Sequence, residues 1–270
     1  MGSKNTIPPL RSGSTVVITG ASSGIGKALV ELLLPFDYTI VAIARRSKEI
    51  PTKGSSKVHP ISCDLSNRKE LAKLVKTCKS LLPNGLDVLV NNAGITAHGR
   101  FEELVPEVFD QTFAINFYAP VFLTQGLLPL LEKRNGVVVS VSTVSGLYGV
   151  PGRAAYSASK SALHAAMESL RIERRGEGIR SIIFCPPYTR TNLRTSGLTA
   201  DGKSLQEEQK EGKIKTPEEV ASQILQAIQN KNSKLVTFDV SGHFVKWFRT
   251  FAPDFLESIL HKKLKKDFEK

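Results

Sequence analysis

The sequence predicts an α/β fold with one parallel sheet and helices on both of its faces. Short apolar runs alternate with longer stretches of helical periodicity along most of the 270 residues, an order typical of parallel strands joined by crossover helices. The apolar runs are nearly continuous in Val, Ile and Leu, as expected for strands covered on both faces. A glycine-rich turn follows the first run at 19–26. Together these observations predict a single doubly wound, Rossmann-like sheet.

Each expected element follows from these patterns. Strands are expected at 15–19, 39–44, 58–62, 88–91, 137–141, 179–185 and 235–240. Helices are expected where apolar residues recur with helical spacing, at 26–34, 68–82, 105–133, 155–177 and 217–230. The polar stretch 191–216 is expected to be a mobile substrate loop, and 243–270 an amphipathic C-terminal extension. We expect residues 1–270 to form a single domain.

The composition limits the classes of function. Lysine and arginine outnumber aspartate and glutamate by 37 to 25, and the net charge of +12 favours anionic partners such as phosphorylated cofactors or a membrane surface. Aromatic residues make up only 7% of the chain, which argues against a nucleic-acid-binding module. Three scattered cysteines predict neither a disulfide framework nor a metal site. With neither a signal peptide nor an apolar run of ~18 residues, we expect a cytoplasmic protein.

The turn Thr19-Gly20-Ala21-Ser22-Ser23-Gly24-Ile25-Gly26 joins the first strand to a helix. Three glycines in such a turn let the backbone approach a pyrophosphate, which is then held at the positive N-terminus of the helix. An ordinary glycine-rich loop is the alternative. The position directly after the first strand favours nucleotide binding.

The end of the second strand indicates which dinucleotide would bind. A carboxylate there would accept a hydrogen bond from the adenosine ribose 2′-hydroxyl and repel a 2′-phosphate. This chain instead has Arg45 and Arg46, whose guanidinium groups suit phosphate. We therefore expect NADP(H), with a solvated basic turn as the alternative.

Three motifs occur in an order that resembles the short-chain dehydrogenase/reductase family. They are the glycine turn, the sequence Asn91-Asn92-Ala93-Gly94, and the pair Tyr156 and Lys160 in Tyr-Ser-Ala-Ser-Lys. The resemblance covers about residues 14–195. It implies cofactor contacts at Gly20, Ser22, Ser23, Gly24, Ile25, Gly26, Arg45, Arg46, Asp64, Leu65, Asn92, Ala93, Gly94, Tyr156, Lys160, Pro186, Thr189 and Thr191. Pro187 stands where the family has a glycine.

Tyr156 and Lys160 are four residues apart, so both lie on one face of the expected helix. A tyrosine titrates near ~10, and a neighbouring ammonium together with the positive nicotinamide would favour the phenolate. The resemblance implies that Tyr156 gives a proton to a carbonyl oxygen while hydride reaches the carbon, and that Lys160 also holds the nicotinamide ribose. A pair with this spacing also occurs by chance on exposed helices.

Three further side chains are assigned by the resemblance. Counting back from both Tyr156 and Gly146 places Thr143 where the family has a substrate-orienting serine, with Ser142 as the substitute. The alternative is that Thr143 only caps a strand end and the enzyme is impaired. Asn116 matches an asparagine that supports a water linked to the lysine, or it is a buried asparagine in a helix kink.

His98 and His164 are expected to be structural, as no partner spacing indicates a ligand or a base.

The C-terminal extension has a wide apolar stripe that we expect Pro253 to divide into two helices. Its members are Phe244, Trp247, Phe248, Phe251, Phe255, Ile259 and Leu264, beside a basic cluster at Lys262, Lys263, Lys265 and Lys266. Such a segment suits peripheral contact with an anionic membrane through 244–266. The alternative is that the stripe packs on the domain or lines the substrate entrance.

The expected function is NADPH-dependent reduction of a ketone, reversible to a secondary alcohol, on an apolar substrate. The tail is similar to those of family members that reduce lipid or sterol ketones, which points to a 3-ketosphinganine, an acyl-glycerone or a steroid. Two alternatives stay open, namely a soluble 3-oxoacyl-thioester reductase and a non-catalytic NADP(H)-binding regulatory protein. The resemblance also implies a homo-oligomer formed through the helices that carry Asn116 and Tyr156.

Overall fold

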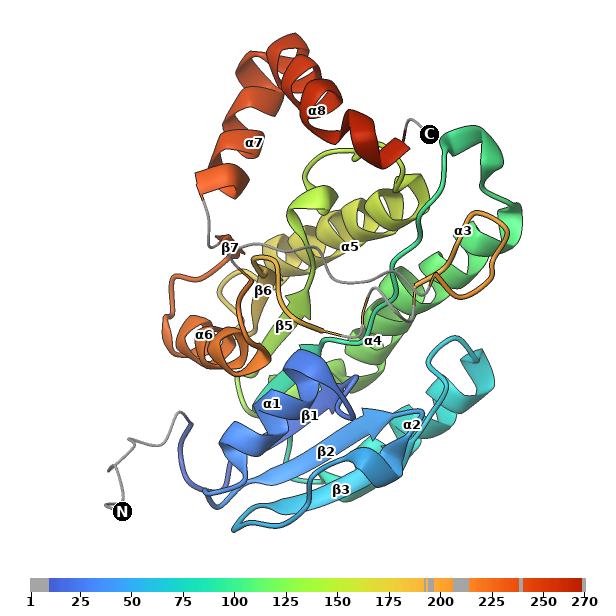
Figure 1. Ribbon diagram of the computed structural model, residues 1–270. Helices are drawn as coiled ribbons and strands as arrows, with labels where there is room; N and C mark the ends of the chain where they lie inside the picture. The colour runs from blue at the N-terminus through green and yellow to red at the C-terminus, as the bar shows by residue number, and fades with distance from the viewer. Residues whose placement is uncertain (1–9, 192, 194–196, 206–213, 238–239, 269–270) are drawn as a thin grey trace, which may run out of the picture.

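The computed structural model describes residues 10–191, 193, 197–205, 214–237 and 240–268 (Figure 1). Its centre is a seven-stranded sheet in the order β3-β2-β1-β4-β5-β6-β7, with every neighbouring pair parallel. The strands are β1 Thr15–Thr19, β2 Thr39–Ala44, β3 Lys57–Ser62, β4 Val88–Asn91, β5 Val137–Val141, β6 Arg180–Cys185 and β7 Leu235–Thr237. The predicted doubly wound fold is confirmed.

Helices cover both faces of the sheet and bury two separate layers of apolar side chains (Figure 1). The helices are α1 Gly24–Leu33, α2 Arg68–Leu81, α3 Pro106–Phe113, α4 Ala119–Glu132, α5 Ala154–Glu173, α6 Pro217–Gln229, α7 Val240–Phe251 and α8 Pro253–Phe268. Helices α1 and α6 pack on one face, and α2, α4 and α5 on the other. Neighbouring strand residues alternate between the layers, as Val17 and Ile18 do, so the central strands are apolar throughout.

The helix expected at 105–133 contains α3, a π-helical turn at Ala114–Tyr118, and α4. Among the described residues, Pro106–Glu132 is the one helical run long and apolar enough to cross a membrane by length and composition. Its side chains Leu123, Leu127 and Leu131 are buried in the sheet layer. The run therefore packs as a core helix, and its apolar character comes from this burial.

Two boundaries differ from expectation at the C-terminal end. Strand β7 stops at Thr237, because helix α7 begins at Val240, and residues 238–239 between them lie outside the described part. The division at Pro253 is observed, since α7 ends at Phe251 and α8 begins with the proline. Figure 1 shows this helical pair at one end of the molecule, apart from the sheet. Residues 192, 194–196 and 206–213 of the expected mobile loop are not described, so that expectation stays a prediction.

Candidate active site

The candidate site lies at the carboxyl edge of the sheet, where the loops after β1, β4, β5 and β6 meet. Parallel strands bring their carboxyl ends to one edge, and ligands of open α/β sheets bind there. The glycine turn follows β1, the Asn-Asn-Ala-Gly motif follows β4, and Thr143 follows β5. The segment 186–191 follows β6. The topology therefore places the predicted motifs at one edge.

The glycine turn requires its glycines for two physical reasons. Gly20 and Gly24 have φ angles of +69° and +51°, which side chains rarely tolerate. A Cβ on Gly26 would lie 2.3 Å from the carbonyl oxygen of Gly20, so the helix could not approach the turn. Ser23 begins α1 without a capping hydrogen bond from its side chain, while Ile25 anchors the turn in the core. This backbone cradle at a helix N-terminus fits a dinucleotide pyrophosphate.

Thr19 ties the glycine turn to the loop after β4. Its hydroxyl accepts hydrogen bonds from the backbone N–H groups of Asn92, at 2.9 Å, and Ala93, at 3.0 Å. The Asn92 amide donates to the Thr19 carbonyl at 2.9 Å. A Cβ on Gly94 would meet the Asn116 Oδ1 at 3.1 Å, so this loop also lies close against the next helix. Sequence reasoning missed Thr19, although its place at the end of β1 was a usable signal.

The segment after β6 closes against the same turn. A Cβ on Gly24 would lie 3.1 Å from the methyl group of Thr191, which places that residue over the start of α1. The Thr189 hydroxyl donates to the Pro187 carbonyl at 2.7 Å. Pro186, directly after β6, is half-buried. These residues therefore form one wall beside the glycine turn.

The strands at the other end of this edge carry the residues expected around the adenosine. Arg45 and Arg46 follow β2 and are exposed, and Arg46 forms an exposed 3.4 Å ion pair with Glu49. Part of the Arg46 charge is thus offset by Glu49, whereas sequence reasoning treated the two arginines alike. After β3, the Asp64 carboxylate accepts hydrogen bonds from the N–H and hydroxyl of Ser66, and Leu65 is half-buried.

Helix α5 presents Tyr156 and Lys160 on its buried face. Burial raises the pKa of Tyr156 to about 12, although the charge of Arg153 and the nearby Thr143 side chain lower it. Lys160 donates from Nζ to the Val141 carbonyl at 2.9 Å, and burial lowers its pKa to about 8. At neutral pH the phenol therefore keeps the proton that an acid catalyst needs.

The two candidate hydroxyl groups after β5 have different partners. Thr143 accepts a hydrogen bond from the Ser145 N–H at 3.2 Å and is half-buried beside Tyr156. Ser142 is buried, and its hydroxyl lies 2.6 Å from Nε2 of His164. The threonine is thus placed beside the phenol, and the serine faces the interior.

Asn116 lies fully buried in the π-helical turn. Its amide donates to the Ile95 carbonyl at 2.9 Å and to the Ser159 hydroxyl at 3.1 Å, and its Oδ1 accepts from the Ile95 N–H at 3.0 Å. Asn116 therefore joins the loop after β4 to helix α5. The buried asparagine in an irregular helix is thus observed, whereas its support of a water linked to the lysine stays a prediction.

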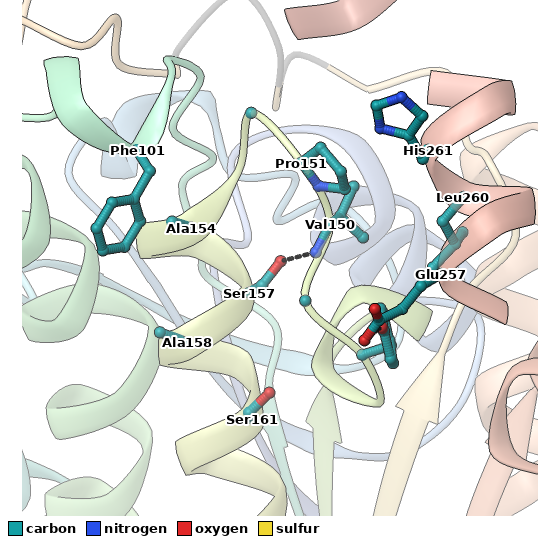
Figure 2. Close-up of a pocket in the computed structure, with 13 residues that line it drawn as sticks. Phe101, Val150, Pro151, Ala154, Ser157, Ala158, Ser161, Glu257, Leu260 and His261 are labelled. Carbon is teal, nitrogen blue, oxygen red and sulfur yellow. Dashed lines mark hydrogen bonds between the residues drawn. The ribbon is translucent and has the colours of Figure 1, made fainter. Parts of the chain in front are cut away.

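A separate cavity of about 560 Å³ lies between α5 and α8 (Figure 2). Ala154, Ser157, Ala158 and Ser161 form one side, and Leu260 of α8 lies across from them. Tyr156 and Lys160 do not line it. Within the described ranges, no group of three or more His, Cys, Asp or Glu side chains could hold a metal ion.

The helical pair α7–α8 contacts the loop that leads into α5. The Tyr148 hydroxyl donates to Glu257 Oε1 at 2.8 Å, and the Arg249 guanidinium donates to the Leu147 carbonyl. Both contacts lie between Thr143 and Tyr156 in sequence. The C-terminal extension is therefore attached to the loop that joins β5 to α5.

Comparison with known proteins finds similar sequences and structures among short-chain dehydrogenases and reductases. A sequence model described as short chain dehydrogenase matches residues 14–201. The chain is 30% identical over 272 residues to a Drosophila melanogaster "Dehydrogenase/reductase SDR family protein 7-like", covering 96% of this chain and 82% of the other. It is 30% identical to "Ketoacyl reductase HetN" of a Nostoc strain, covering 83% of this chain and 78% of the other. A metagenomic short-chain oxidoreductase solved in complex with NADP has a TM-score of 0.67 and 26% identity, covering 84% and 97% of the two chains.

Proposed function

The chain belongs to the short-chain dehydrogenase/reductase family, oxidoreductases that interconvert alcohol and carbonyl groups with NAD(P), and we propose that it reduces the ketone of an apolar, lipid-like substrate with NADPH. The observation that carries the reaction is the buried Tyr156 phenol, with the Thr143 side chain near enough to lower its pKa and the buried Lys160 one turn further along the same helix. A carbonyl oxygen placed between the two hydroxyl groups would accept from both. This arrangement is that of an acid catalyst with an orienting donor.

Each side chain has a separate task in the proposed reduction. NADPH, held on the glycine turn, would supply the hydride. Thr143 orients the carbonyl oxygen, and Tyr156 donates the proton that the oxygen needs as it gains negative charge. Lys160, whose lowered pKa permits exchange of a proton near neutral pH, would bind a ribose hydroxyl of the cofactor and return a proton to the phenol. Asn116 holds the loop after β4 against α5, so that these groups keep their spacing.

The preference for NADPH is proposed from the residues after β2. Arg45 is exposed at the carboxyl edge, and no carboxylate occupies the position where NAD-specific folds place one. A guanidinium can bind the 2′-phosphate through two parallel hydrogen bonds. The NADP complex of the metagenomic relative supports the choice by similarity.

The apolar substrate class is proposed from the C-terminal helices. Three large aromatic side chains are more than half exposed, namely Trp247 at 56%, Phe251 at 69% and Phe255 at 52%. The ring centroids of Trp247 and Phe251 are 5.2 Å apart, and those of Phe255 and Phe248 are 5.1 Å apart. Lys262 and Lys263 are exposed on the same extension. Exposed rings beside lysines suit the interface of an anionic bilayer. We propose a cytoplasmic enzyme that associates peripherally with a membrane and takes its substrate there.

The test is NADPH oxidation by the full-length protein with sphingoid, glycerolipid and steroid ketones, each presented in phosphatidylcholine–phosphatidylserine vesicles. Turnover with at least one apolar ketone, faster with vesicles than in detergent-free buffer, is expected. Turnover of none of these, with NADPH still bound, would contradict the proposal, and failure with a 3-oxoacyl thioester as well would favour a regulatory NADP(H)-binding protein.

A second candidate is a soluble 3-oxoacyl-thioester reductase, which the similarity to the Nostoc ketoacyl reductase favours. Acyl thioesters on a soluble carrier need no bilayer. Comparison of a 3-oxoacyl thioester in buffer with the vesicle-borne ketones separates the two functions, because this candidate predicts full activity without vesicles.

A further inference from the structure

A buried histidine lies directly behind the candidate catalytic groups and has no part in the reaction as proposed. His164 is on α5, one turn beyond Lys160 and two turns beyond Tyr156, and it is 6% exposed. Its Nε2 lies 2.6 Å from the hydroxyl of Ser142, the residue before Thr143. A single hydrogen bond therefore connects the helix that carries the acid to the loop that carries the orienting hydroxyl.

The far end of the same loop is attached to the same helix. Gly146 lies so close to the His164 ring that a Cβ at this position would be 2.8 Å from Nε2. The Ser161 hydroxyl donates to the Gly146 carbonyl at 2.9 Å. The loop 142–146 is thus held on α5 at both ends, and Thr143 lies between the two attachments.

The Ser142–His164 pair is buried, and further contacts hold both residues in place. Ser142 also donates its N–H to the Phe184 carbonyl at 2.7 Å, and the Cys185 thiol lies 4.0 Å from His164 Nε2. Burial, and then the charge of Lys160, lower the pKa of His164 to about 4, so the ring is neutral at physiological pH. A neutral imidazole offers one donor and one acceptor, which is enough to fix a single hydroxyl.

We propose that His164 is a positioning residue that holds Ser142, and through it Thr143, at the distance from Tyr156 that carbonyl reduction requires. This proposal rests on the proposed function. A buried hydrogen bond between neighbouring elements fixes their relative position, and a misplacement of about 1 Å in a catalytic group can cost on the order of 10²-fold in rate. His164 would act on the catalytic groups from the protein interior and would not contact the substrate.

The test is a double-mutant cycle on the full-length protein with the ketone that it turns over. His164→Leu and Ser142→Ala are each expected to lower kcat by roughly ten- to a hundredfold while the Kd for NADPH stays unchanged. The double variant should lose little more than either single variant, because both remove the same bond. His164→Gln, which can return a polar atom near the position of Nε2, should restore most of kcat.

Met167→Leu is the matched control, since Met167 is another buried side chain on the same face of α5 and does not contact the loop through a side-chain hydrogen bond. Its kcat should equal that of the parent even if its Tm falls. Losses that multiply in the double variant, or a His164→Leu variant that loses Tm but keeps kcat, would overturn the positioning role.

A crystal structure of His164→Leu separates this proposal from the proposed function. The Thr143 hydroxyl is expected to lie farther from the Tyr156 phenol than in the parent. An unchanged distance between the two hydroxyl groups would overturn the positioning role whether or not the parent enzyme turns over a ketone. A parent without turnover of any ketone, together with a displaced Thr143, would instead contradict the proposed function alone.

Discussion

The buried face of α5 and the helical pair α7–α8 make opposite use of their side chains. On α5, polar groups are hidden, with Lys160 4% exposed and Ser159 fully buried, and each has a hydrogen-bond partner inside the protein. On α7–α8, large aromatic rings are exposed and pack mainly on one another, with Phe251 69% exposed. Polar groups lie where water is excluded, and apolar rings lie where water is present.

This difference separates the two tasks of a reductase. Buried polar groups with hydrogen-bond partners keep their geometry and strengthen electrostatic effects on a reacting carbonyl. Exposed rings cannot stabilise the core, but they can bind an apolar surface or substrate. Changes on α5 should therefore alter the rate of chemistry, and changes on α7–α8 should alter access to the substrate.

Tyr156→Phe should have the largest effect. The ring still fills its site, but the proton donor is lost, so kcat should fall by ~10²–10⁴-fold while NADPH binding persists. Single-turnover NADPH oxidation measures the first quantity, and NADPH fluorescence titration the second. A variant that keeps more than a tenth of the parent rate would show that another group donates the proton.

Replacement of Thr143 tests the orienting hydroxyl. Thr143→Val keeps the shape without the donor and should lower kcat by ~10²–10³-fold, the usual cost of one such donor. Thr143→Ser keeps the hydroxyl and serves as the control, with a rate close to that of the parent. Equal kcat values for the two variants would show that the Thr143 hydroxyl does not orient the substrate.

Arg45→Asp should weaken NADPH binding more than NADH binding. A charge-assisted hydrogen bond to the 2′-phosphate is worth roughly 1.5–3 kcal/mol, or about ten- to a hundredfold in Kd. Arg46→Asp is the control, and a smaller change is expected because Arg46 already pairs with Glu49. Calorimetric titration with both cofactors gives the ratio of the Kd for NADH to the Kd for NADPH. A parent protein that binds the two cofactors equally would exclude a binding site for the 2′-phosphate at this turn.

The smallest effect is expected from Trp247→Ser on the exposed helices. Loss of one partly inserted ring should weaken binding to phosphatidylserine-containing vesicles by roughly tenfold, and raise KM for a vesicle-borne ketone, at unchanged kcat. Vesicle co-sedimentation provides the measurement. Ile172→Ser, at an apolar side chain that is 71% exposed on α5, should leave vesicle binding unchanged. An equal loss in both variants would mean that α7–α8 has no special affinity for the bilayer.

Local sequence predicts the central strands well, because burial on both faces requires nearly continuous apolar runs such as Val137–Val141. The glycine turn is also predictable, since its backbone conformation excludes other residues. The π-helical turn could not be predicted in the same way. Asn116 follows ordinary helical residues, and its irregular backbone is stabilised by contacts with Ile95 and Ser159, which are distant in sequence.

Long-range pairing also explains what was missed around the site. The structural role expected for His164 stays a prediction, but its partner Ser142 lies 22 positions away and has no local signal in the sequence. The attachment of α8 through Glu257 to Tyr148 spans 109 positions and has no local signal. The assigned roles of Thr143, Tyr156 and Lys160 stay predictions until turnover is measured.

The central place of β1 has a consequence for synthesis of the chain. β1 pairs with β2 on one side, but its other neighbour, β4, follows about 70 residues later. At ~5–20 residues per second on the ribosome, one hydrogen-bonding edge of β1 stays unpaired for several seconds. An uncovered edge of this kind can pair with the same edge on another nascent chain. Aggregation during translation should therefore peak before Val88–Asn91 emerges, and a chaperone that shields the three-stranded intermediate should raise the yield of folded protein.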